Sequence, residues 1–274
     1  MGWLTRLTLN DGAPAAPAPE GTDLAGALRE SLGRLRADFI DPRTGWVDYA
    51  RLATSEGFAR YADLARRLRD IELLTLRSDA ERRAFWLNLY NALAMHGVIA
   101  LGLRRSVWEA GNFFWRVGYV VGGYRFSLDE IEHGLLRANR RPPYRPLRPF
   151  RFGDPRRQFA VGACDPRLHF ALTCGARSCP PIRFYRAEDL EDQLRTAAEA
   201  LVNSPEVRID AGANRAELSM LFHWYARDFG ATRAEVLAFV HRHLRDGPEK
   251  AHLGAHLSDI TVGYLPYQWE LNSA

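Results

Sequence analysis

The chain has 274 residues, 47% of them hydrophobic and 11% aromatic, and can bury a substantial core as one large domain or as two closely joined lobes. Its formal net charge of +4 is a mild excess and no recognised nucleic-acid module is apparent, so no nucleic-acid partner is expected. No apolar run approaches the ~20 residues that cross a bilayer, and the start lacks the apolar core of a secretory signal. These features favour a soluble cytoplasmic protein without a membrane span.

The N-terminal part of the chain is expected to be helical. Residues 1–22 read as a flexible lead rich in Pro and Ala, and apolar residues at helical spacing predict an amphipathic helix over 23–39. A second helix is expected over Ser55 to Arg69. Ser78–Glu81 is a capping box, and the run that follows it, ERRAFWLNLYNALAMHGVIALG, is apolar on nearly every face. This third helix is therefore predicted to be central and buried.

A change of pattern follows this helix. The segment WRVGYVVGGYRFSL predicts a hairpin that turns at Gly122–Gly123, and Ser127–Glu130 is a second capping box that opens a short helix. From Arg137 to Arg157 the chain is rich in Arg and Pro, with Asp154 as its only acid. We interpret this stretch as a solvated, Pro-stiffened loop, the alternative being a surface for phosphate or a nucleic-acid backbone. A strand is predicted from about Arg167 to Thr173.

The C-terminal part alternates short elements. We expect a helix over 187–201, strands near 207–209 and 217–219, a helix capped at Thr232, and a closing strand and turn in DITVGYLPYQW. Together the elements predict an α+β fold, with residues 23–274 as a single domain. Its helical N-terminal part surrounds a central buried helix, which packs on a small, mostly antiparallel sheet.

The segment HFALTCGARSCPP, from His169 to Pro181, brings one histidine and two cysteines into one loop. If His169 lies on a strand, Cys174 points to the opposite face, whereas Cys179, beyond Gly175, is free to turn back. Cys179 is therefore the better candidate nucleophile, with Cys174 second. The alternatives are a disulfide between the two cysteines or two small buried side chains. Zinc held with His133 is a further alternative, but the spacing matches no standard zinc pattern.

Two other groups of polar residues are candidates. Asn88 and Asn91 lie three apart on an apolar helix, and buried amides need partners, so we expect them to organise neighbouring loops in preference to direct catalysis. Glu132 and His133 place an acid beside an imidazole. Adjacent helical positions diverge by about 100°, so each is expected to face a different partner.

The chain resembles the domain of unknown function 547 family from about Val47 to Asn272. The likeness rests on five motifs in order: AFWLNLYNALAMHGV, GYRFSLDEIEHGLLR, DPRLHFALTCGARSCPPIR, LSMLFHWYARDFG and YLPYQWELN. The resemblance implies motif residues that carry over by position: Asn88, Asn91, Glu132, His133, His169, Cys174, Cys179 and Asp228. A weaker likeness to the transglutaminase and papain-like arrangement implies a cysteine nucleophile, although the central helix carries Asn88 where that arrangement has its cysteine.

The leading functional hypothesis is a cysteine-dependent hydrolase or acyl transferase that acts on an amide or thioester of a small peptide-like substrate. Cys179 or Cys174 would attack, His169 would act as general base, and Asn88, Glu132 or His133 would assist. Asn91, Arg177 and Asp228 are the candidate binding residues. The alternatives are a non-enzymatic module that binds a ligand or protein, and a His/Cys metal enzyme. We expect neither a cofactor nor a metal. The sequence does not indicate an oligomeric state.

Overall fold

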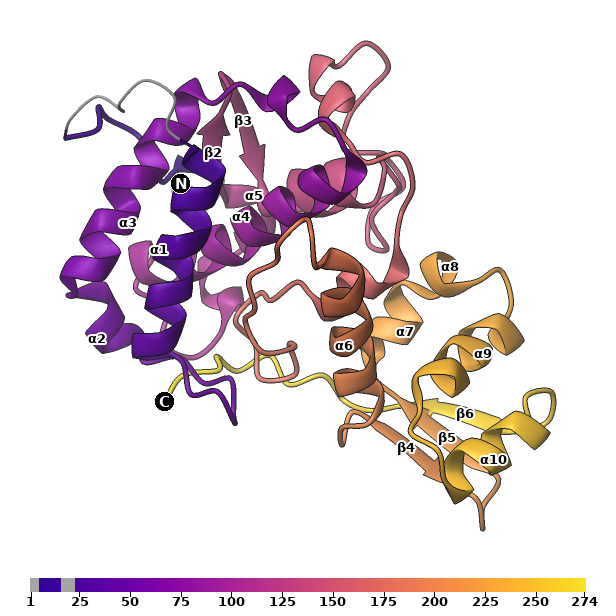
Figure 1. The fold of residues 1–274 in the computed structure, drawn as a ribbon. Coiled ribbons are helices and arrows are strands. Elements are labelled where there is room, and N and C mark those ends of the chain that lie inside the picture. The colour runs from indigo at the N-terminus through magenta and orange to yellow at the C-terminus, as the bar shows by residue number, and fades with distance from the viewer. Residues whose placement is uncertain (1–4, 16–22) are drawn as a thin grey trace. The chain divides into compact units, whose positions relative to one another are not determined.

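The structure is a computed structural model that describes residues 5–15 and 23–274, and it divides the chain into two compact units. Unit 1 comprises Met1–Ala163, Leu172–Leu190 and Trp269–Ala274, and unit 2 comprises Cys164–Ala171 and Glu191–Gln268. Helices follow one another along much of the chain and the strands gather in small sheets (Figure 1), which confirms the predicted α+β class. The assignment of residues 23–274 to a single domain stays a prediction.

Unit 1 is built around α4 (Asp79–Ala100), whose side chains are buried without interruption from Ala84 to Val98. The predicted capping box opens this helix: Ser78 accepts the N–H of Glu81, and the Glu81 carboxylate accepts the N–H of Ser78. A helix that is apolar on all sides is stable only when other elements cover it, so the prediction of a central buried helix is confirmed.

Two helices lie side by side at the N-terminal end of unit 1, α1 (Leu24–Phe39) and α3 (Glu56–Arg66) (Figure 1). Helix α1 begins after Asp23, whose side chain accepts the N–H of Gly26, and buries one stripe of leucines. The other helical elements of unit 1 are α2 (Tyr49–Ala53), η2 (Arg67–Asp70), η3 (Leu73–Thr75), η4 (Val107–Ala110), α5 (Phe113–Arg116), η5 (Glu130–Leu136) and η6 (Pro155–Phe159).

The sheet of unit 1 has three strands in the order β1 (Leu7–Thr8), β2 (Val117–Val121) and β3 (Tyr124–Ser127). The predicted hairpin forms β2 and β3, which are antiparallel, whereas β1 pairs with β2 in parallel. Asn10 extends this pairing: its side chain accepts the N–H of Val120 and donates to the carbonyls of Val120 and Ala65. Part of the predicted flexible lead is thus held in the sheet, because the fully buried side-chain amide of Asn10 forms hydrogen bonds with the backbone of two other segments. Residues 1–4 and 16–22 of that lead lie outside the described residues.

The predicted strand from Arg167 to Thr173 is wrong. Pro166–Phe170 forms a 3₁₀ helix, η7, whose first turn is capped by the Asp165 carboxylate on the N–H of Arg167 at 3.0 Å. An Asp-Pro pair fixes the start of such a turn, and this local signal outweighs the alternation of apolar residues after it. The alternating faces expected for His169 and Cys174 therefore do not exist.

Unit 2 has its own sheet, β4 (Val207–Asp210), β5 (Arg215–Leu218) and β6 (Thr261–Tyr264), with β5 antiparallel to β4 and parallel to β6. Most of α6 (Leu190–Val202) belongs to this unit, together with α7 (Met220–Trp224), α8 (Ala226–Phe229), α9 (Arg233–His243) and α10 (Pro248–Ala255). Its core is a cluster of aromatic and aliphatic side chains centred on Phe170, Phe222 and Phe239. Instead of one mostly antiparallel sheet, residues 5–15 and 23–274 form two small mixed sheets, because each unit adds a strand from a distant part of the chain.

Candidate functional site

The two cysteines of the HFALTCGARSCPP segment meet in unit 1. Their sulfurs lie 2.9 Å apart, and the backbone N–H of Cys174 donates to Cys179 Sγ at 3.1 Å. Cys174 is buried, whereas Cys179 is partly exposed. Both residues are free cysteines, and their sulfurs lie within hydrogen-bonding distance of each other. Donors aimed at a sulfur favour its thiolate form, which is the nucleophilic species.

The cysteine loop is anchored to α4 by the two asparagines. Asn91 accepts the N–H of Thr173 at 2.9 Å and donates to the carbonyl of Arg183 at 3.1 Å. Asn88 accepts the N–H of Tyr185 and donates to its carbonyl. Both amides therefore bind backbone groups just before and just after the cysteine pair, which is the loop-organising role that the sequence favours for them.

The C-terminal segment of unit 1 holds the same loop from another direction. Asn272 receives a hydrogen bond from the Tyr49 hydroxyl at 3.0 Å, and its backbone N–H donates to the carbonyl of Gly175. Gly175 has φ +88°, and a Cβ there would lie 3.1 Å from the Tyr49 hydroxyl, so glycine suits this turn on both counts. Burial and the nearby sulfurs of Cys174 and Cys179 raise the pKa of Tyr49 far above its usual range. The hydroxyl therefore stays a donor at physiological pH.

Arg177 lies between the two cysteines in sequence and is exposed. Its backbone N–H donates to the carbonyl of Glu270, and its guanidinium lies over the ring of Trp46, 5.5 Å from the centroid. This contact places an exposed cation on an aromatic face beside the cysteine loop. The role of Arg177 as a binding residue stays a prediction.

Glu132 and His133 lie on η5, which is a π-helix, a form that often marks functional sites. Glu132 accepts the Tyr90 hydroxyl at 3.1 Å, while His133 Nδ1 lies 3.0 Å from Arg137 and Nε2 3.1 Å from the Tyr144 hydroxyl. Arginine only donates, so Nδ1 accepts and Nε2 donates. Glu132 Oε1 and His133 Nδ1 also approach within 3.6 Å of each other.

The hydrogen-bonded chain continues beyond His133. The Tyr144 hydroxyl donates to Asp129, whose other oxygen lies 3.5 Å from Arg145. Burial raises the pKa of Asp129, while the bond from Tyr144 and the charge of Arg145 oppose that rise. Tyr144, Asp129 and Arg137 were not among the sequence-predicted site residues. The arginine-rich stretch gives no local signal that its Arg137, Tyr144 and Arg156 side chains contact η5.

His169 belongs to unit 2, where it forms a buried pair with Asp228. His169 Nε2 lies 2.9 Å from Asp228 Oδ2, and both side chains are 1% exposed. The imidazole stacks on Tyr225, with ring centroids 3.8 Å apart and planes inclined by 16°. A carboxylate on one ring nitrogen orients an imidazole, as required of a general base. The sequence names both residues but does not predict their pairing.

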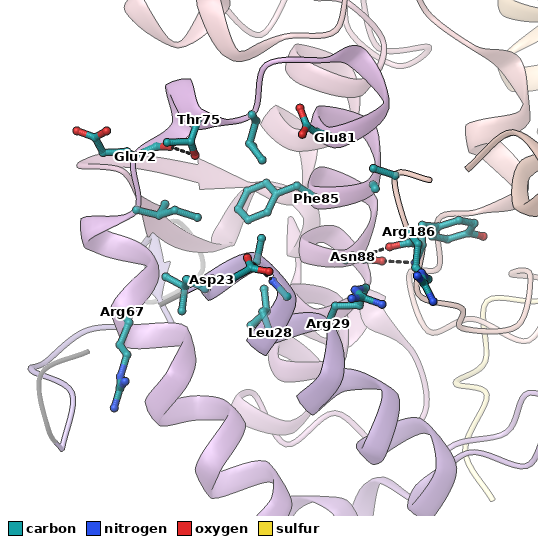
Figure 2. A pocket seen from close by; sticks show the side chains of 18 of the residues that line it. Asp23, Leu28, Arg29, Arg67, Glu72, Thr75, Glu81, Phe85, Asn88 and Arg186 are labelled. Carbon is teal, nitrogen blue, oxygen red and sulfur yellow. Dashed lines mark hydrogen bonds between the residues drawn. The ribbon is translucent and has the colours of Figure 1, made fainter. Parts of the chain in front are cut away.

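A hollow in unit 1 lies beside α4 and has a volume of about 860 Å³. Figure 2 shows Asn88 at one edge and Asp23, Arg29 and Glu81 around the opening. Of the predicted site residues in the described chain, Asn88 alone lines this hollow. Its amide is already bonded to Tyr185, so the hollow adds no reactive group to the cysteine loop.

Neither a metal site nor a membrane-spanning helix is found within the described residues. No three His, Cys, Asp or Glu side chains there are grouped to hold one ion, and no described helix is long and apolar enough to cross a bilayer.

The comparisons with known proteins agree with the motifs. Residues 74–202 match the family model described as "Protein of unknown function, DUF547", which confirms the predicted resemblance over that range. No curated protein and no solved structure matches the chain significantly. The matched range contains Asn88, Glu132, His169 and both cysteines of the loop, whereas Asp228 lies outside it. The transglutaminase and papain-like arrangement stays a prediction.

Proposed function

We propose that the protein is a thiol-dependent enzyme, a hydrolase or acyl transferase, and that Cys179 is its nucleophile. The observation that carries the proposal is the position of Cys179 Sγ, 3.1 Å from the N–H of Cys174 and 2.9 Å from Cys174 Sγ. Both groups can donate to a Cys179 thiolate, and the partial exposure of Cys179 leaves the sulfur open to attack a carbonyl.

The reaction has two steps. The thiolate of Cys179 forms a bond to the carbonyl carbon of an amide or thioester, and the C–N or C–S bond then breaks, so that the leaving amine or thiol takes up a proton. Water, or a second nucleophile, next attacks the acyl-cysteine and restores the thiol.

A second candidate function is thiol–disulfide exchange, and the 2.9 Å between the two sulfurs favours it. In that chemistry Cys179 attacks the disulfide of a substrate and releases one substrate thiol. Cys174 then attacks the Cys179 sulfur of the mixed disulfide, which forms a Cys174–Cys179 disulfide and releases the second substrate thiol. An external dithiol reductant returns the oxidised pair to thiols. The two candidates differ in their need for Cys174.

A simple thioester probe tests the proposal. The full chain is incubated with the probe at neutral pH, and the acylated cysteine is identified by peptide mass spectrometry. We expect the acyl group on Cys179, retained in Cys174→Ser and absent from Cys179→Ser, with Cys164→Ser as the matched control. Equal acylation of all three cysteines, or none, contradicts the proposal.

Alkylation kinetics provide the second readout. We expect iodoacetamide to modify Cys179 with a rate midpoint below the pH of about 8.5 that is typical of an ordinary cysteine. Uniformly slow alkylation of all three cysteines would argue for a binding module instead. If Cys174→Ser traps a stable mixed disulfide with an added disulfide substrate, but no acyl-enzyme forms, thiol–disulfide exchange replaces acyl transfer as the function.

A further inference from the structure

Residues 140–153, here named the arginine loop, expose large apolar side chains. Phe152 is 99% exposed, Leu147 69% and Tyr144 58%. Phe152 precedes Gly153, which has φ +83° and turns the chain at this point. Clustered exposed apolar side chains are costly in water and typically mark a surface that is covered by a partner.

The same loop is strongly cationic. It contains five arginines and no acidic residue. Arg145 forms an ion pair with Asp129, and Arg148 donates to the carbonyl of Asn139. In the described part of the chain, no carboxylate lies within ion-pair distance of Arg141, Arg148 or Arg151. Much of the positive charge is therefore available to an anionic partner.

The charged and apolar side chains surround one open hollow of about 640 Å³. Its rim includes Arg141, Arg145, Arg148, Arg151, Leu147 and Phe152. A hollow of this size accepts a ligand as large as a lipid headgroup, and several guanidinium groups around it suit a phosphate. The apolar side chains lie beside the cations.

The base of the arginine loop is fixed to η5. Asn139 accepts the N–H of Phe150 at 3.0 Å and donates to its carbonyl at 2.9 Å. Phe150 is buried against Gly134, where an added Cβ would lie 2.4 Å from the ring. These contacts hold the base of the arginine loop against η5.

We propose that the arginine loop binds the surface of an anionic phospholipid bilayer. Phe152 and Leu147 enter the interface between headgroups and acyl chains, while the arginines contact lipid phosphates. The observation that favours a bilayer over RNA or an acidic protein is the fully exposed ring of Phe152, which lies with exposed Leu147 among the cations of the loop. Peripheral proteins use this combination of apolar insertion and basic contacts.

Vesicle co-sedimentation of the full chain tests the proposal. We use vesicles of phosphatidylcholine alone and vesicles with equal parts of phosphatidylcholine and phosphatidylserine. Binding to the anionic vesicles is expected to be at least about tenfold tighter and to fall as NaCl is raised. The double variant Arg148→Ala/Arg151→Ala should lose about 25-fold, at about fivefold for each arginine, and Phe152→Ser should lose about tenfold.

Matched controls separate the loop from general surface effects. Leu147→Ser should weaken binding, whereas Leu74→Ser, at a site that is also 69% exposed but outside the loop, should not. Arg77→Ala/Arg242→Ala is the corresponding charge control. Equal binding to both vesicle types, or loop variants that bind like the wild type, overturns the proposal. Capture of the chain by polyuridylate RNA without vesicle binding also overturns it and assigns the arginines to nucleic acid.

Discussion

Asn88 binds the backbone of Tyr185 through both ends of its amide, with Oδ1 2.6 Å from the Tyr185 N and Nδ2 2.8 Å from the Tyr185 O. The contact joins α4 to a segment 97 residues further along the chain. It is made by a side chain that is 5% exposed, so water cannot replace it. Together with Asn91, it fixes the two ends of the cysteine loop.

Removal of the Asn88 amide should destabilise unit 1 and release the cysteine loop. Asn88→Ala leaves two buried backbone groups without partners, which costs about 3 kcal/mol of unfolding free energy. Urea denaturation measures this cost, and alkylation of Cys174 should become faster in the variant. Asn88→Asp is the sharper test: its carboxylate repels the Tyr185 carbonyl at pH 7, whereas a protonated carboxyl can donate, so part of the stability should return at pH 5. A pH-independent loss would contradict this role.

Stability should decrease in acid because of His96, which is buried on α4. Burial lowers the pKa of His96 from 6.5 to about 4. Between these two values the unfolded chain binds a proton at His96 and the folded chain does not. The unfolding free energy is therefore undiminished above pH 6.5 and decreases as the pH falls toward 4. The loss is about 2 kcal/mol at pH 5. Urea denaturation of the wild type and His96→Gln at pH 7 and pH 5 measures it. Equal pH dependence in both proteins would exclude His96 as the cause.

The Tyr144 hydroxyl should stabilise the folded protein more at neutral pH than in acid. The raised pKa of Asp129 favours folding below the unfolded value of 3.8, and this advantage is lost as pH rises through the folded pKa. Tyr144→Phe removes a donor to the buried carboxylate and should raise that pKa further. We expect a loss of about 1–2 kcal/mol at pH 7 and a smaller loss at pH 5. The ring stays in place, so a constant difference across pH would point to packing instead.

Two glycine-to-alanine substitutions should change the unfolding free energy in opposite directions. At Gly134 on η5, a new Cβ would meet the Phe150 ring at 2.4 Å, and we expect a loss of about 1–3 kcal/mol. At Gly33, inside α1, nothing lies within 4 Å, and the better helix former should add about 0.5–1 kcal/mol. Thermal and urea denaturation of both variants provide the comparison. Stabilisation by Gly134→Ala would mean that Phe150 does not pack on η5 as described.

The sequence by itself determines the local elements and the family likeness. Helix caps such as Ser78 with Glu81, and the uninterrupted apolar run of α4, act within one or two turns, so they can be recognised without knowledge of the rest of the chain. The Gly122–Gly123 turn was equally recognisable. The same local reasoning failed at Arg167–Thr173, where apolar alternation suggested a strand and the Asp165–Pro166 turn prevailed.

Only the tertiary structure decides which of the marked residues meet. His169 and Asp228 are 59 residues apart, and Thr173 and Asn91 are 82 apart. Hydrogen bonds between residues so far apart in sequence depend on how the whole chain folds. The hydrophobic periodicity of the sequence predicts local elements only, so it does not predict these contacts. The 2.9 Å contact of Cys174 with Cys179 also follows from a loop that is held at both ends by α4 and the C-terminal segment. The sequence thus names the reactive residue types, and the packing within each unit decides their partners.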